Sequence, residues 1–123
     1  MTALPLRIAI RLSGAFLLLA IVLFAVSLSR APAWVFWYYL GAGAASAALY
    51  GYDKHAAAQG AWRISEATLH TVDMAGGIIG GLAGQALFRH KTSKTGFGAT
   101  TAVVYALHVV ALGALIAGLY DLG

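Results

Sequence analysis

Apolar residues fill four long stretches of the chain, and short polar connectors separate them. The stretches 12–28 and 99–120 are long enough to cross about 30 Å of hydrocarbon as helices, at about 1.5 Å per residue. The stretches 34–52 and 69–88 are of similar length and contain polar interruptions. The pattern predicts an all-α integral membrane protein in which residues 1–123 form one membrane domain, a bundle of four hydrophobic helices.

Composition supports the membrane class and excludes several kinds of chemistry. The chain is 61% hydrophobic and 10% charged, whereas soluble domains are about 25% charged. Its eight Lys and Arg residues lie at the ends of the apolar stretches, which is where membrane proteins carry them, so we expect no nucleic-acid partner. The absence of cysteine excludes disulfides and thiolate metal sites. We predict a multi-pass protein of the inner (plasma) membrane, without a cofactor.

Local signals place the ends of two predicted helices. Pro32 disfavours helix at the residue before it and starts the second helix. The aromatic residues that follow, from Trp34 to Tyr39, are typical of the headgroup level of a membrane. Ser65 is expected to cap the third helix, with Glu66 in the first turn against the helix dipole.

The third stretch is rich in glycine and allows two conformations. Gly76, Gly80 and Gly84 recur at every fourth residue, and Gly77 and Gly81 repeat the spacing, so the stretch is typical of a closely packed spanning helix. Alternatively, the two glycine pairs break the helix into a re-entrant hairpin, which is allowed where its backbone is buried against other helices.

The distribution of positive charge bears on this choice. If the third stretch spans the membrane, the basic residues divide four and four between its sides. If the stretch turns back, only Arg30 remains outside, and seven basic residues lie on the inner side. The positive-inside bias therefore favours the hairpin. We retain the four-span bundle as the fold prediction, with the hairpin as its alternative.

Polar side chains near the connectors are the candidate site residues. The ligand-binding candidates are Asp53, Lys54, Arg63, Arg89, His90, Lys91 and Lys94. The basic run 89–95 mixes cations with hydroxyl groups, a composition that binds phosphate through charge-assisted hydrogen bonds. The same composition also fits a connector that only makes generic contacts with anionic lipid heads. Glu66 and His70 lie one helical turn apart, so the carboxylate can orient the imidazole as a general base, although such pairs are routine on helices.

Two further polar residues lie within apolar stretches. Asp73 is inside the third stretch, where an ionisable group is costly and water or Tyr50 could satisfy it. His108 in the last stretch is expected to be a hydrogen-bonded packing residue. No standard zinc spacing is present, so we predict no metal site.

A linked set of motifs occupies the second half of the chain: Asp53-Lys54, Arg63-Ile64-x-Glu66, Leu69-His70, Gly76-Gly77 with Gly80, Arg89-His90-Lys91-Thr92, Lys94 and Phe97. With these motifs, residues 50–108 resemble a family of small bacterial inner-membrane proteins without an assigned function. The family usually has proline where this chain has Ser65. Some members carry a cold-shock domain before the membrane part, which the short apolar N-terminus here does not match. The resemblance thus implies which residues to test rather than a reaction.

The leading functional hypothesis is binding of an anionic, phosphate-bearing ligand or lipid headgroup at the membrane interface. The cations of the candidate set would contact the anion, and Asp53, Glu66 and His70 would position them. Two alternatives remain open. One is an enzyme acting on a lipid headgroup, with His70 as general base oriented by Glu66. The other is a helix-packing scaffold or homo-oligomer that assembles through its glycine groove.

Overall fold

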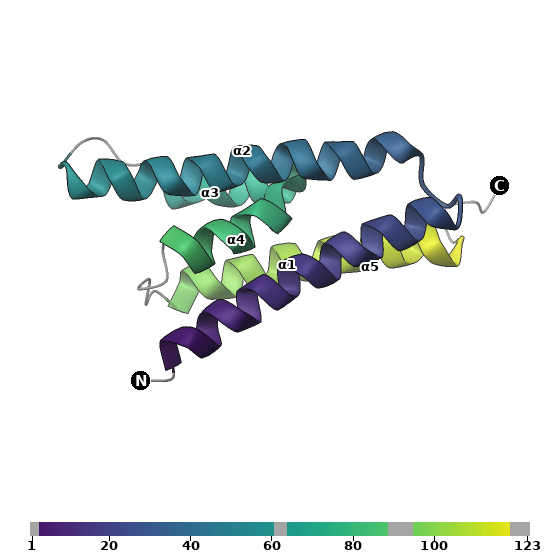
Figure 1. The fold of residues 1–123 in the computed structure, drawn as a ribbon, viewed down its shortest axis with the longest axis horizontal. Helices are drawn as coiled ribbons and strands as arrows, with labels where there is room; N and C mark the ends of the chain where they lie inside the picture. Colours follow the sequence, from purple (N-terminus) through teal and green to yellow (C-terminus); the bar gives the residue numbers. More distant parts are fainter. Residues whose placement is uncertain (1–2, 61–63, 89–94, 119–123) are drawn as a thin grey trace.

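The computed structural model describes residues 3–60, 64–88 and 95–118, and the elements within these ranges are helical (Figure 1). In chain order they are α1 (Ala3–Ser27), α2 (Ala33–Ala58), α3 (Glu66–Val72), the π-helical turn η1 (Asp73–Gly77), α4 (Ile78–Phe88) and α5 (Thr95–Ala117). The predicted all-α class is confirmed for this part of the chain.

Three long helices frame the molecule. The helices α1 and α5 run in the same direction and contact each other, and α2 runs the opposite way (Figure 1). The short helix α4 lies between α1 and α2 and contacts both. The main core joins α1, α4 and α5 with one end of α2, and its buried members include Leu18, Val22, Tyr39, Ile78, Leu82, Val104 and Leu112.

The helix ends agree with the capping signals, with one exception. Pro32 has an extended backbone, with φ −65° and ψ 153°, and precedes the first residue of α2 as predicted. Ser65 caps α3, because its hydroxyl accepts a hydrogen bond from the Thr68 N–H at 3.1 Å. The second helix, however, continues past the predicted end at residue 52 to Ala58, since residues 56–58 are alanines, the strongest helix formers.

The third apolar stretch is not one continuous helix. Its backbone departs from helical geometry at Gly76, which has φ +127° and ψ −3°, inside the turn η1. This region of φ favours glycine, because a side chain there would be strained. A Cβ at Gly76 would also overlap the ring of Tyr38 on α2. The chain therefore turns back at this residue, and α3 and α4 form the two arms of a hairpin (Figure 1).

Both arms of the hairpin end at the same level of α2. Tyr50 is fully buried, and Leu69 of α3, Phe88 of α4 and Ile64 all pack in the cluster around it. The turn at Gly76 lies beside Tyr38, twelve residues earlier on α2, which is about 18 Å along the helix axis. The expectation of one uninterrupted third helix is not met, and the stretch is broken into a hairpin at Gly76.

Glycines allow the hairpin to approach α2 closely. A Cβ at Gly80 would overlap the carbonyl oxygen of Gly43, and a Cβ at Gly77 would lie 2.8 Å from the Ser46 Cβ. A Cβ at Gly84 would lie 2.7 Å from the Cβ of Tyr50. Four of the candidate packing glycines thus face the α2 helix of the same chain, namely Gly76, Gly77, Gly80 and Gly84, whereas Gly81 faces Asp73.

Two of the helices are suited to a membrane. The stretches Ile8–Ser27 in α1 and Gly98–Ala117 in α5 are each 20 residues long and apolar enough to cross. Only 22% of the first and 17% of the second is buried within the molecule. Their outward surfaces carry large apolar side chains, among them Ile10, Phe16, Leu23, Phe24, Leu107 and Val110. Water would not solvate these surfaces favourably, and lipid would.

Candidate functional site

The acidic candidate Asp53 is a buried residue of α2 rather than part of a connector. Its Oδ1 accepts a hydrogen bond from the backbone N–H of Ile64 at 2.9 Å, and its side chain is fully buried. Asp53 therefore ties Ile64, at the start of the hairpin, to α2. Ile64 directly follows Arg63 in the sequence. Its neighbour Lys54 is exposed on the same helix.

The proposed catalytic pair lies at the base of the hairpin. Glu66 is the first residue of α3 and His70 is in its last turn, and both side chains are half-buried. Across the described residues, no group of three or more His, Asp or Glu side chains is arranged to hold a metal ion. A catalytic role for Glu66 and His70 stays a prediction.

The basic candidates fall mostly outside the described part of the chain. Arg63, Arg89, His90, Lys91 and Lys94 lie outside the described residues. The described residues that flank them, Ile64 and Phe88, both pack against Tyr50. The described ends of the hairpin therefore lie at one end of the molecule, near the start of α5 (Figure 1).

A buried carboxylate lies at the centre of the hairpin. Asp73 is fully buried and accepts hydrogen bonds from the Ser46 hydroxyl and, at 3.0 Å, from the Tyr50 hydroxyl. The sequence left water or Tyr50 as the partner of Asp73, and the structure has Tyr50. A Cβ at Gly81 would overlap the carboxylate, so glycine at this position makes room for it. The charge-bearing group is thus enclosed by α2 on one side and α4 on the other.

A chain of hydrogen bonds links this carboxylate to α1 and α5. The Gln85 amide nitrogen donates to the Tyr50 hydroxyl at 3.2 Å and to the Thr101 hydroxyl at 3.0 Å. The Gln85 carbonyl oxygen accepts from Arg11 Nε at 3.0 Å. We call Asp73, Ser46, Tyr50, Gln85, Thr101 and Arg11 the buried polar network. It joins all three long helices to the hairpin.

Four members of the network, Arg11, Ser46, Gln85 and Thr101, were not singled out as site residues from the sequence. The signal that could have found Gln85 is that it is the only polar side chain from residue 78 to 88, since an isolated polar residue in an apolar stretch needs a partner. Serine and threonine are common in packed membrane helices, so Ser46 and Thr101 carry no such signal.

Side chains also satisfy the carbonyl groups that the turn η1 exposes. The His108 Nε2 lies 3.2 Å from the Asp73 carbonyl oxygen and 3.1 Å from that of Met74, and its Nδ1 lies 2.7 Å from the Tyr39 hydroxyl. Because carbonyl groups only accept, Nε2 carries the proton, and in the neutral ring Nδ1 accepts from Tyr39. The Tyr38 hydroxyl donates to the Ala75 carbonyl. His108 is therefore a hydrogen-bonded packing residue, as predicted.

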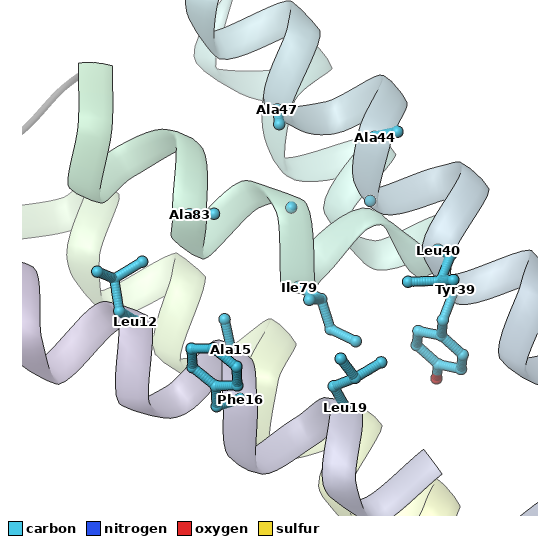
Figure 2. A pocket seen from close by; sticks show the side chains of 12 residues that line it. Leu12, Ala15, Phe16, Leu19, Tyr39, Leu40, Ala44, Ala47, Ile79 and Ala83 are labelled. Atoms are coloured by element: carbon cyan, nitrogen blue, oxygen red, sulfur yellow. The ribbon is translucent and has the colours of Figure 1, made fainter. Parts of the chain in front are cut away.

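Two clefts flank the contact between α1 and α4. One is an apolar groove of about 460 Å³ between α1, α2 and α4, into which Leu12, Phe16, Leu19 and Ile79 project (Figure 2). The other is a cleft of about 320 Å³ between α1, α4 and α5, which we call the Arg11 cleft. Its lining combines polar and apolar residues: Ile10, Arg11, Gly14, Leu82, Gln85, Gly98, Thr101, Ala102 and Tyr105.

Comparison with known proteins places the hairpin in a family context. Residues 43–97 match a family model described as "Protein of unknown function (DUF1294)". The matched range covers most of α2 and the whole hairpin, with Ser46, Tyr50, Asp73 and Gln85 of the buried polar network, whereas Arg11 and Thr101 lie outside it. The chain matches no curated protein and no solved structure.

Proposed function

We propose that this chain is a multi-pass membrane protein in which α1, α2 and α5 cross the bilayer and the α3–α4 hairpin enters and leaves through one face. The apolar outward surfaces of α1 and α5 support the membrane location. The length of α2, 26 residues, corresponds to about 39 Å and is sufficient to cross. The polar network supports burial of the hairpin backbone against the long helices, which a re-entrant segment requires.

The hairpin gathers the basic residues of the sequence at one face of the proposed membrane domain. With both hairpin arms ending beside Tyr50, seven Lys and Arg residues belong to this face, and Arg30 alone belongs to the other. The positive-inside bias then assigns the basic face to the cytoplasm of a bacterial inner membrane. This arrangement is the one in which Asp53, Glu66 and the run 89–94 can share a site.

The function that this arrangement supports best is binding of a phosphate-bearing anion, such as a lipid headgroup, at the basic face. Arg63, Arg89, His90, Lys91 and Lys94 would contact the anion. The Asp53 Oδ1 accepts a hydrogen bond from the Ile64 N–H at 2.9 Å, which would fix the chain directly after Arg63. Glu66 and His70, at the base of the same arm, would orient the cations. The single observation that carries the proposal is the shared packing of Leu69 and Phe88 against Tyr50.

The double substitution R89A/K91A tests this function. We expect it to weaken binding of phosphatidylglycerol to the detergent-solubilised protein about thirtyfold, because each basic residue near an anionic surface contributes about 1 kcal/mol. The dissociation constant would be measured by native mass spectrometry. The single variants R89A and R30A form a matched pair, because each removes one guanidinium group, R89A from the proposed basic face and R30A from the opposite face. Unchanged binding in R89A/K91A, or a loss in R30A equal to that in R89A, would contradict the proposal.

A further inference from the structure

Arg11 is a charged residue in the first turn of an apolar stretch of α1. It is the fourth residue of the stretch Ile8–Ser27, which is long and apolar enough to cross a membrane. A charged side chain within such a helix is costly and needs a partner. No carboxylate forms an ion pair with Arg11 among residues 3–60, 64–88 and 95–118. Among the described residues, the guanidinium therefore has a neutral partner, Gln85, and no counter-ion.

The guanidinium is held in a defined position. Its Nε donates to the Gln85 carbonyl oxygen at 3.0 Å, and the side chain of Gln85 is only 2% exposed. The Gln85 amide nitrogen is itself fixed by hydrogen bonds to Tyr50 and Thr101. A long basic side chain in a membrane helix commonly extends toward the headgroups instead. Here the hydrogen bond to Gln85 directs Arg11 across the molecule.

Arg11 lines the Arg11 cleft and keeps donors that could reach a ligand there. Within the described residues, its two terminal nitrogens make no hydrogen bond. The cleft, of about 320 Å³, is also lined by the polar residues Thr101 and Tyr105. Two parallel N–H donors on a guanidinium match the geometry of a phosphate, and a fixed fork loses little entropy when it binds one.

The rest of the cleft indicates what is attached to the anion. Ile10, Leu82 and Ala102 supply an apolar wall, and Ile10 is 61% exposed toward the surroundings of the helix. An inorganic phosphate would leave this wall uncovered, whereas a phospholipid would cover it with the glycerol and the start of an acyl chain. The cleft thus combines a fixed cation with an apolar wall, which is the chemistry of an anionic amphiphile.

We propose that the Arg11 cleft binds the phosphate of an anionic phospholipid, with Arg11 as the anion ligand and Gln85 as the residue that positions it. The site is distinct from the basic connectors and uses none of their residues. It rests on the membrane location proposed above but not on anion binding by Arg89 or Lys91. The lipid would connect α1, α4 and α5 at the polar end of the cleft.

Filling the cleft is the most selective test. Gly98 lines the cleft, and a Cβ there would meet no atom within 4 Å, so G98F should fold while it occupies the space of the lipid. A Cβ at Gly113, on the same helix but outside the cleft, also has open space, which makes G113F the matched control. This test and the next are made in the R89A/K91A background, so that lipid bound at the basic face does not mask the cleft. There we expect G98F to weaken phosphatidylglycerol binding at least about tenfold and G113F to leave it unchanged.

Substitution of the cation tests the chemistry. R11L should lose affinity for phosphatidylglycerol at least about tenfold, because it removes hydrogen bonds to a charged group, whereas R11K should lose less because it retains the charge. The R89A/K91A variant should retain a bound lipid that G98F removes, so this proposal and the surface site fail separately. Equal affinity in R11L and the native chain, or equal losses in G98F and G113F, would overturn it.

The nature of the ligand is tested with two further probes. A diacylglycerol with the same acyl chains lacks the phosphate and should bind at least about tenfold more weakly than phosphatidylglycerol. Inorganic phosphate in large excess should not displace the lipid, because it does not cover the apolar wall. Equal binding of diacylglycerol would reduce the cleft to an apolar surface, and displacement by inorganic phosphate would assign it to a free anion; either result contradicts the proposal.

Discussion

Replacing Gly80 with alanine is expected to separate α4 from α2 and destabilise the whole hairpin. The added Cβ would overlap the backbone carbonyl of Gly43, which no side-chain rotation can move away. Overpacking of a core typically costs about 1–3 kcal/mol, and a clash between two backbones belongs at or above the upper end. The free energy of unfolding, measured by thermal or denaturant unfolding in detergent, should fall by about 3 kcal/mol or more.

The control for this prediction is the same substitution where there is space. A Cβ at Gly41, on α2, meets no atom within 4 Å, so G41A should leave the packing intact. Alanine also stabilises a helix interior by about 0.5–1 kcal/mol relative to glycine. G41A should therefore unfold at the same temperature as the native chain or higher. If G80A were as stable as G41A, the close approach of α2 and α4 would be wrong.

Replacing Asp73 with alanine should produce the second large effect. The substitution removes the acceptor of the Ser46 and Tyr50 hydroxyls, both of which belong to buried side chains. A buried polar group left without a partner costs about 1–3 kcal/mol. D73A should therefore lower the free energy of unfolding by about 2 kcal/mol or more.

Asparagine at the same position supplies the comparison. D73N keeps the shape and one acceptor oxygen, so it should destabilise the protein less than D73A does. T71A provides a background value, because Thr71 is exposed and its hydroxyl donates only to the Ala67 carbonyl of the same helix, at 2.7 Å. If D73A unfolded with the same free energy as T71A, the carboxylate would not hold the hairpin together.

The sequence predicted the long helices because their signals are local. Pro32 and Ser65 act within a few residues, and the structure has the expected helix start at each. The end of α2 was misplaced because Asp53 and Lys54 look like connector residues, whereas Asp53 is buried and bonded to Ile64. Only the packing of the hairpin against α2 makes that burial favourable, and no local pattern carries this information.

The turn at Gly76 could be proposed from the sequence but not chosen. The spacing of the glycines is typical of a packed helix and also allows a broken one. What selects the break is tertiary: Tyr38 lies beside Gly76, and His108 and Tyr38 satisfy the carbonyls of residues 73–75. These partners lie more than 30 residues away in sequence. The charge distribution was the sequence signal that favoured the same answer.

The buried polar network was only partly predictable for the same reason. Asp73 was identified as an unusual charge, with water or Tyr50 as its partner, because a carboxylate in an apolar stretch requires a donor. Gln85 and Arg11 are 74 residues apart, yet they share a hydrogen bond. Contacts at this separation depend on the fold, so the Arg11 cleft is visible only once α1, α4 and α5 are placed together.

The hairpin has a direct consequence for function. A third helix that spanned would place Glu66 and His70 on one side of the membrane and the run 89–94 on the other. A hairpin would place both sets of residues at one face, so the proposed anion site depends on it. The topology of the third apolar stretch therefore decides whether the proposed anion site can form.

Cysteine accessibility tests that topology most directly. The native chain has no cysteine, so single cysteines at Ala57, Ser93 and, as the control for the opposite end, Ala33 can be labelled with a membrane-impermeant maleimide. We predict that in intact cells only the cysteine at position 33 reacts, and that the cysteines at 57 and 93 react together after permeabilisation. Labelling of positions 57 and 93 from opposite sides of the membrane would contradict the hairpin and the shared site.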